Sequence, residues 1–462
     1  MKNMTLENIA RACEGRYVGN EQTKQLEVKG VVTDSRQVEE GFLFIPIKGA
    51  RVDGHDFIPK VQQQGAGAVL SEQRLAEGSQ PYILVNSCEQ ALKDIAMFYR
   101  EQLTIPIVGI TGSVGKTSTK EMIASVLSQK YKVLKTAGNF NNEIGLPLTI
   151  LRIREEHQAA VVEMGISDFG EMHRLAKIAK PDICVITNIG ICHLENLKTR
   201  DGIFHAKSEI FDFINSNAHI ILNGGDDKLA AVGTIKGIEP VFYAAEGEMH
   251  REYVDIFASE IINCGLKGVN AQIHTPKGSI WVEIPIPGQH NVSNAMAAIG
   301  VGLSLGLTLE EMKAGIESVE TIGGRTNLLD IHEMIVIDDC YNANPVSMKA
   351  SVDVLKNGLG RTIAVLGDMG ELGEKEKQLH YEVGKFVAEK KIDVLFCAGT
   401  LSLEIAKGAK ENGTYPVFCY PSKEEMIPPL LAYLKEGDTI LVKASHFMEY
   451  PKVVKAIQDK FA

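Results

Sequence analysis

The residues of this chain best suited to chemistry form a glycine-rich, phosphate-binding sequence: Thr111, Gly112, Ser113, Val114, Gly115, Lys116, Thr117 and Ser118. The glycines let backbone N–H groups turn toward phosphate oxygens, Lys116 supplies a full positive charge, and the Thr117 hydroxyl suits Mg²⁺. The strict pattern has a glycine five positions before Gly115, where this chain has Ile110. The sequence is therefore a shortened variant of the phosphate loop, and it predicts binding of ATP or GTP.

Two residues farther along could hold a divalent ion opposite this loop. Glu163 ends an apolar run, and His193 follows a second apolar run at 183–188. Mg²⁺ usually takes one or two protein ligands together with phosphates and waters. For Glu163 we favour the metal role, with a helix cap as the alternative, whereas a single histidine such as His193 is more often a structural residue.

Three further groups of polar residues have a ligand-binding and a structural interpretation. Asn139 and Asn142 lie in an asparagine-rich stretch that could simply form turns. Asn291 and Asn294 begin an expected helix, where their amides could cap the helix or hydrogen-bond an adenine edge. Asp339 ends an expected strand, where its carboxylate could bind ribose hydroxyls or lie in a solvated turn.

The elements that must position these residues alternate along the chain. Strand-like apolar runs with helical patterns between them occur at 105–110, 159–163, 183–188 and 219–222. This alternation predicts a mostly parallel sheet covered by helices on both faces. Open parallel sheets bind ligands where their strands end, which is where the polar residues above are expected.

The length of 462 residues predicts about three domains. We expect an α/β protein with a small α/β domain at 1–100, a central P-loop parallel-sheet domain at 101–320 and a Rossmann-like domain at 321–462. The strand-like runs of the last domain are 334–337, 362–366, 394–397, 417–419 and 439–442. This domain lacks a glycine fingerprint, so its expected fold alone predicts no cofactor.

The composition excludes several classes of protein. Hydrophobic residues make up 45% of the chain and charged residues 23%, as in ordinary globular proteins. The net charge is −11 and no block of lysines or arginines occurs, which argues against a nucleic-acid or anionic-membrane surface. The eight cysteines are scattered without a CxxC pair, so neither a disulfide framework nor a zinc site is expected. With no signal-like start and no 18-residue apolar run, we expect a cytoplasmic protein.

Eight motifs between residues 111 and 373 carry a resemblance that extends over essentially the whole chain. They are TGSVGKT at 111–117, NFNNEIG at 139–145, VEMG at 162–165, NIG at 188–190, AKSEIF at 206–211, GQHN at 288–291, YNANP at 341–345 and GDMGELG at 367–373. Together they resemble the Mur ligases, the amide ligases of peptidoglycan synthesis. The last two motifs resemble the branch that joins D-alanyl-D-alanine to UDP-N-acetylmuramoyl-tripeptide. The resemblance implies a monomeric, ATP- and Mg²⁺-dependent enzyme that forms an acyl phosphate.

The resemblance implies roles for the residues around the phosphate loop. Lys116 would hold the β- and γ-phosphates of ATP, and Thr117 and Glu163 would bind one Mg²⁺. His193 would help to hold a second Mg²⁺. Lys207 corresponds to a lysine that is carbamylated in this family, so that its tip becomes a carboxylate; its sequence context alone suggests only a charge on a helix surface.

The resemblance also implies ligand contacts for residues far apart in the chain. They are Asn291 and Asn294 for adenine, Asp339 for ribose, Arg325 for phosphate, Ser35 and Arg36 for the uridine nucleotide, and Asn139, Asn142, Asn344, Lys443 and Ser445 for the peptide substrates. Of these, Asn139 and Asn142 would lie where the acyl donor and the acceptor meet.

The chain departs from the family pattern at two places. His446 stands where relatives usually carry arginine, which removes a permanent, planar cation able to bind a carboxylate through two bonds. Ile45-Pro46 replaces a common pair of small residues in the first domain. Other hypotheses remain open: another Mur-type or folylpolyglutamate-type amide ligase, or a P-loop switch protein that hydrolyses nucleotide without ligation.

Overall fold

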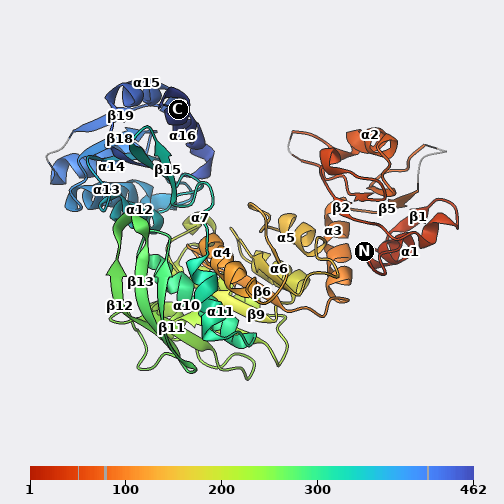
Figure 1. The fold of residues 1–462 in the computed structure, drawn as a ribbon. Helices are drawn as coiled ribbons and strands as arrows, with labels where there is room; N and C mark the ends of the chain where they lie inside the picture. Colours follow the sequence, from red (N-terminus) through yellow and green to blue (C-terminus); the bar gives the residue numbers. More distant parts are fainter. Residues whose placement is uncertain (50, 77–80, 414–415, 462) are drawn as a thin grey trace.

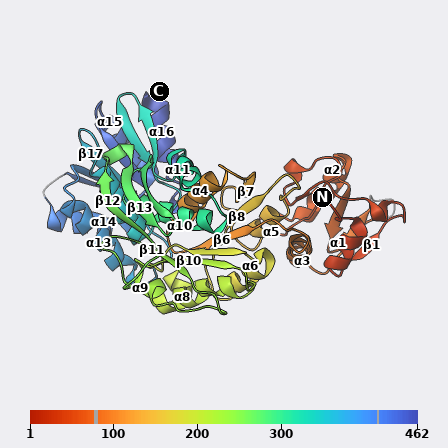
Figure 2. The same ribbon diagram turned by 60° about the horizontal axis from the view of Figure 1, so that its bottom comes forward.

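Three sheets, each with its own helices, make up the computed structural model, which describes residues 1–49, 51–76, 81–413 and 416–461. The N-terminal and C-terminal units lie on different sides of a larger central unit (Figures 1 and 2). The predicted α/β architecture of three units is confirmed. The domain boundaries at 100/101 and 320/321 stay predictions.

The N-terminal sheet has five short strands in the order β1-β5-β4-β3-β2. Its strands are β1 (Arg16–Val18), β2 (Val31–Val32), β3 (Leu43–Phe44), β4 (Ala68–Ser71) and β5 (Tyr82–Leu84), and its helices are α1 (Leu6–Ala12), α2 (Ile58–Gln63) and α3 (Cys88–Arg100). Only β1 runs antiparallel to its neighbour. The apolar face of α3 packs on helices of the central unit, so the two units share one hydrophobic core.

The central sheet has nine strands in the order β14-β13-β12-β11-β10-β9-β6-β8-β7. They are β6 (Ile107–Thr111), β7 (Val133–Lys135), β8 (Ala159–Glu163), β9 (Ile183–Ile186), β10 (His219–Asn223), β11 (Val241–Ala245), β12 (Ile256–Asn263), β13 (Val269–Thr275) and β14 (Gly278–Ile284). In sheet order, the strands from β7 across β6 to β12 are parallel. The strands β13 and β14 add an antiparallel edge. The mostly parallel sheet is thus confirmed, with an edge that the sequence pattern did not predict.

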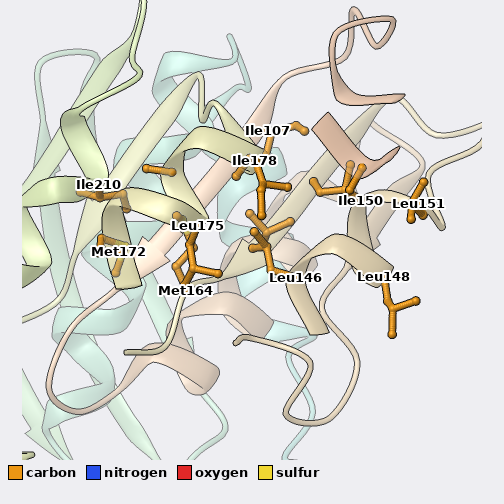
Figure 3. Close-up of a cluster of buried hydrophobic side chains, with 14 of the residues drawn as sticks. Ile107, Leu146, Leu148, Ile150, Leu151, Met164, Met172, Leu175, Ile178 and Ile210 are labelled. Carbon is orange, nitrogen blue, oxygen red and sulfur yellow. The ribbon is translucent and has the colours of Figure 1, made fainter. Parts of the chain in front are cut away.

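Helices cover both faces of this sheet. They are α4 (Lys116–Leu127), α5 (Gly145–Ile150), α6 (Glu171–Ala179), α7 (Leu194–Leu197), α8 (Arg200–Ser208), α9 (Asp227–Ala230), α10 (His290–Ser304) and α11 (Leu309–Glu317). One face packs against α4, α10 and α11, and the other against α5, α6 and α8. Figure 3 shows part of the second core, where Leu146 of α5 lies near Leu175 and Ile178 of α6. Because both faces of the central strands β6, β8 and β9 are buried and apolar, these strands present polar side chains only where they end.

The C-terminal sheet has six strands in the order β15-β16-β20-β17-β18-β19. They are β15 (Asn327–Ile331), β16 (Met334–Asp338), β17 (Thr362–Gly367), β18 (Val394–Ala398), β19 (Val417–Tyr420) and β20 (Thr439–Lys443), and only β15 is antiparallel. The helices are α12 (Pro345–Leu355), α13 (Glu376–Glu389), α14 (Ser402–Asn412), α15 (Lys423–Tyr433) and α16 (Pro451–Phe461). All five predicted strands of this unit occur. Among the described residues, no helix is both long and apolar enough to cross a bilayer.

Candidate active site

The phosphate loop connects buried strand β6 to helix α4, as its sequence predicts. Gly112 and Gly115 have φ angles of 152° and 80°, which favour glycine. A Cβ atom on Gly112 would lie 1.9 Å from Thr187 Oγ1, so this position also excludes a side chain by space. Lys116 Nζ donates a hydrogen bond to Gly112 O over 2.8 Å, which folds the lysine over its own loop.

Residues after strand β9 hold this loop in shape. Asn188 Oδ1 accepts the N–H of Val114 over 3.0 Å, and Thr187 Oγ1 donates to Val114 O over 2.6 Å. Ser113 Oγ donates to Gly190 O over 3.0 Å. The sequence reasoning gave Thr187 no role; its position where β9 ends, beside the phosphate loop, is the signal that would have found it.

The two residues expected to bind one Mg²⁺ touch each other. Thr117 Oγ1 donates to Glu163 Oε2 over 3.0 Å, and Glu163 is 2% exposed. Hydroxyl and carboxylate oxygens are ligands that Mg²⁺ prefers. Glu163 caps no helix in the described chain; it ends β8 and faces the phosphate loop.

Lys207 lies within the protein and not on a helix surface. It is 0% exposed, and within the described ranges its Nζ has no hydrogen-bond partner. Burial lowers the pKa of the Lys207 ammonium from 10.5 to about 8, and the nearby charge of Lys116 adds to this effect. A buried amine that loses its proton this easily fits carbamylation, because only the neutral amine reacts with CO₂.

His193 connects the central unit to the C-terminal unit. Its Nδ1 lies 2.5 Å from Glu371 Oε2. The ring is half-buried, and the backbone of His193 itself has a φ angle of 49°. The neighbouring His193 imidazole lowers the pKa of the Glu371 carboxyl. In this arrangement the expected metal ligand is engaged by a carboxylate instead.

The predicted adenine-binding residues form a buried chain of amides. Asn291 Nδ2 donates to Pro287 O over 2.9 Å, Asn294 Nδ2 donates to Asn291 Oδ1 over 2.9 Å, and Thr119 Oγ1 donates to Asn294 Oδ1 over 2.9 Å. This series of hydrogen bonds joins α10 to α4. Asn294 borders the cavity described below, and Asn291 lies behind it.

In the asparagine-rich stretch, Asn142 bonds to the backbone at the start of α5. Its Oδ1 accepts the N–H of Gly145 over 2.9 Å at the start of α5. Asn139 is exposed. Asn141, which the sequence reasoning did not select, donates from Nδ2 to Glu163 Oε1 over 2.9 Å.

In the C-terminal unit, the Asp339 carboxylate is engaged by protein donors. Lys443 Nζ donates to Asp339 Oδ2 over 2.7 Å, Ser351 Oγ donates to the same oxygen, and the N–H of Thr326 donates to Oδ1 over 3.2 Å. Lys443 also donates to Asn342 O over 3.1 Å. Both carboxylate oxygens of Asp339 therefore have protein partners. A ribose hydroxyl would have to share one of these oxygens with them.

Of the remaining predicted residues, Asn344 and Ser445 have hydrogen-bond partners, whereas the buried Nε of Arg325 has none within the described chain. The Arg325 guanidinium stacks 4.1 Å from the centre of the Tyr341 ring, and Asn344 Oδ1 caps α12 by accepting the N–H of Ser347. Ser445 Oγ donates to Ala343 O over 3.2 Å.

Ser35 and Arg36 lie in the N-terminal unit, in a short 3₁₀ turn at Ser35–Gln37. Arg36 is exposed and donates to Asp34 through Nε over 2.9 Å. This bond lowers the pKa of the Asp34 carboxyl to about 2.

One cavity of about 1130 Å³ joins the central and C-terminal units. The predicted site residues that line it are Ser113, Val114, Gly115, Lys116, Thr117, Ser118, Asn142, Glu163, His193, Asn294, Arg325, Asp339, Asn344 and Lys443. The predicted site residues outside its lining are Thr111, Gly112, Ser35, Arg36, Asn139, Lys207, Asn291 and Ser445. The structure thus brings residues from 113 to 443 around one space.

A second group of metal-type ligands, His55, Glu72 and Cys88, lies in the N-terminal unit. His55 Nδ1 lies 2.7 Å from Asp53 Oδ1, and its Nε2 accepts the N–H of Glu72 over 3.2 Å. Because both ring nitrogens have partners, this histidine is a structural one.

Comparisons with known proteins cover nearly the entire chain. Residues 110–302 match the Mur ligase middle domain, 324–446 the Mur ligase, glutamate ligase domain, and 27–100 the Mur ligase family, catalytic domain. A UDP-N-acetylmuramoyl-tripeptide–D-alanyl-D-alanine ligase of Bacillus subtilis (strain 168) is 37% identical over 461 residues, 98% of each chain. A crystal structure of MurF from Acinetobacter baumannii superimposes with a TM-score of 0.88 at 34% identity, covering 98% of each chain. The MurF ligase from Thermotoga maritima in complex with ADP gives a TM-score of 0.80 at 29% identity, covering 94% of this chain and 98% of the other.

Proposed function

The chain belongs to the Mur ligase family, and on that premise we propose that it joins D-alanyl-D-alanine to UDP-N-acetylmuramoyl-tripeptide at the expense of ATP. The observation that carries this proposal is the full-length similarity to ligases of that name, at 37% identity over 98% of the chain. The N-terminal unit is part of the match, which favours this reaction over the folylpolyglutamate alternative.

The reaction requires two bond-forming steps. A carboxylate oxygen of the tripeptide attacks the γ-phosphorus of ATP, and ADP leaves. The amine of D-alanyl-D-alanine then attacks the carbonyl carbon of the acyl phosphate, loses a proton, and phosphate leaves as the amide forms. Lys116, which folds over the phosphate loop, would offset negative charge on the phosphates during the first step.

The residues present fit a divalent ion beside the phosphates. Thr117 and Glu163 would hold one Mg²⁺, and His193 with carbamylated Lys207 would hold a second. Bound Mg²⁺ would offset the charge that develops on the transferred phosphoryl group. A carbamate at Lys207 would turn a buried cation, which repels an ion, into a ligand.

Closure of the C-terminal unit over the nucleotide would keep water from the acyl phosphate. Arg325 lines the shared cavity from that unit, where a guanidinium can bind phosphate oxygens. The enzyme would act as a monomer in the cytoplasm, on small-molecule substrates rather than nucleic acid.

The test is ADP release by the purified protein with each substrate omitted in turn. We expect ADP only when ATP, Mg²⁺, the UDP-linked tripeptide and D-alanyl-D-alanine are all present, with stoichiometric amide product by mass spectrometry. A P-loop switch protein would release ADP without either peptide. That result, or no amide product with either a lysine- or a diaminopimelate-containing tripeptide, would refute the proposal.

A further inference from the structure

The side chain of Asn141 reaches the carboxylate that is expected to bind Mg²⁺. Its Nδ2 donates to Glu163 Oε1 over 2.9 Å. The neighbouring Asn142 turns instead to the start of α5, and Asn139 is exposed. Asn141 is therefore the member of this asparagine-rich stretch that is in contact with the candidate metal ligands.

Glu163 is held from three directions. Its N–H donates to Thr136 Oγ1 over 3.0 Å, Thr117 Oγ1 donates to its Oε2 over 3.0 Å, and Asn141 donates to its Oε1. The carboxylate cannot rotate without losing one of these donors. Since Glu163 is 2% exposed and each carboxylate oxygen accepts a side-chain hydrogen bond, these two bonds fix the orientation of the carboxylate.

Gly165 makes room for the Asn141 amide. A Cβ atom on Gly165 would lie 3.0 Å from both Cγ and Nδ2 of Asn141, which is tighter than ordinary contact. The N–H of Gly165 also donates to Asn141 O over 2.9 Å. Backbone and side chain of Asn141 are thus both fixed against the segment that follows β8.

We propose that Asn141 is a positioning residue, which holds the Glu163 carboxylate in the orientation that receives the divalent ion. This inference rests on the proposed function, because it takes Glu163 as a metal ligand. When an ion engages Thr117 and Glu163, the bond from Asn141 is kept, since each carboxylate oxygen has two lone pairs. Donors that orient a metal ligand typically change metal affinity by about 10- to 100-fold when removed.

The experiment measures binding of Mn²⁺, which suits the same oxygen ligands as Mg²⁺, to the full-length protein with ADP and no peptide substrate. We expect Asn141→Ala to weaken Mn²⁺ binding by at least tenfold in calorimetry, with affinity for the UDP-linked tripeptide and melting temperature close to the parent's. Gly165→Ala, which keeps Asn141 but displaces its amide, is expected to weaken Mn²⁺ binding in the same direction. Asn217→Ala, an exposed asparagine before β10, is the matched control and should bind Mn²⁺ like the parent.

Two outcomes would overturn the proposal. One is a Mn²⁺ affinity of Asn141→Ala within twofold of the parent's. The other is loss of ligation with unchanged Mn²⁺ binding, which would make Asn141 a direct substrate contact. If Asn141→Ala does not fold, the same criterion applies to Gly165→Ala. Failure of the proposed function shows separately, as a parent protein that binds Mn²⁺ with ADP but forms no amide.

Discussion

Two largely buried polar clusters can be compared: the central cluster of Lys116, Glu163 and Lys207, and the C-terminal cluster of Asp339 and Lys443. In the central cluster, Lys207 Nζ has no hydrogen-bond partner within the described chain, and Lys116 bonds only to its own loop. In the C-terminal cluster, the Asp339 carboxylate and the Lys443 ammonium satisfy each other and are surrounded by further partners.

The two clusters thus differ in whether their buried groups already have protein partners. A buried polar group without a partner is costly, so it persists where a ligand or modification completes it. A buried ion pair with every atom engaged needs nothing more and serves to hold loops together. The central cluster is thus expected to govern catalysis, and the C-terminal cluster stability.

The largest effect is expected from Lys116→Ala, which removes the cation from the phosphate loop. ADP formation should fall by about 10³-fold or more, because charge stabilisation dominates phosphoryl transfer. Full-turnover assays at saturating ATP measure this. Lys132→Ala, at a largely exposed lysine, is the control and should leave turnover unchanged. Near-parent activity of Lys116→Ala would show that the central cluster does not take part in catalysis.

The next effect concerns the C-terminal cluster. Lys443→Met leaves the Asp339 carboxylate buried without its cation, and we expect a loss of about 3 kcal/mol in the free energy of unfolding. The double variant Lys443→Met/Asp339→Asn should recover part of this loss, because no charge is then left unpaired. Urea unfolding measures both. A stable Lys443→Met protein with a raised KM for ATP would instead show a ligand site.

The sequence predicted the α/β sheets and the phosphate loop because both depend on local patterns. The apolar runs at 159–163 and 183–188 became β8 and β9, and Gly112 and Gly115 adopt the backbone angles that only glycine readily adopts. The antiparallel edge formed by β13 and β14 escaped prediction, because a strand's direction depends on its partner and not on its own residues.

Side-chain partners were predictable only in part. Nothing in a helical pattern distinguishes a buried Lys207 from an exposed one; the family resemblance alone indicated its role. Asn139, Asn141 and Asn142 have the same side chain, yet Asn141 contacts Glu163, Asn142 bonds to the backbone at the start of α5, and Asn139 is exposed to solvent. Tertiary packing determines which partner each of these side chains contacts.

A smaller effect is expected from Lys207→Ala, which removes one member of the central cluster. Without a carbamate at this position we expect activity to fall by about 10- to 100-fold, in proportion to the loss of one metal ligand. Added acetate or propionate should restore part of it by occupying the space of the lost carboxylate. Lys116→Ala is the matched control, since it should gain nothing from these acids. An unimpaired Lys207→Ala protein would rule the carbamate out.

The smallest effect concerns His193, which could belong to either cluster because Glu371 of the C-terminal unit engages it. Glu371→Gln should free the imidazole for the ion and raise Mn²⁺ affinity in the presence of ADP by about two- to fivefold, since partly exposed ion pairs contribute only about 0–1 kcal/mol. The pKa of Glu371 is lowered in the folded protein, so the stabilisation from its charge is present above pH 4.5 and is lost as the pH falls through the lowered value. The parent's advantage in melting temperature over Glu371→Gln should therefore disappear at the acid end of a series from pH 6 to pH 3. If Mn²⁺ affinity does not change and the melting difference persists at pH 3, Glu371 does not compete with the ion for His193. In that case His193 does not belong to the central cluster with Glu163 and Lys207.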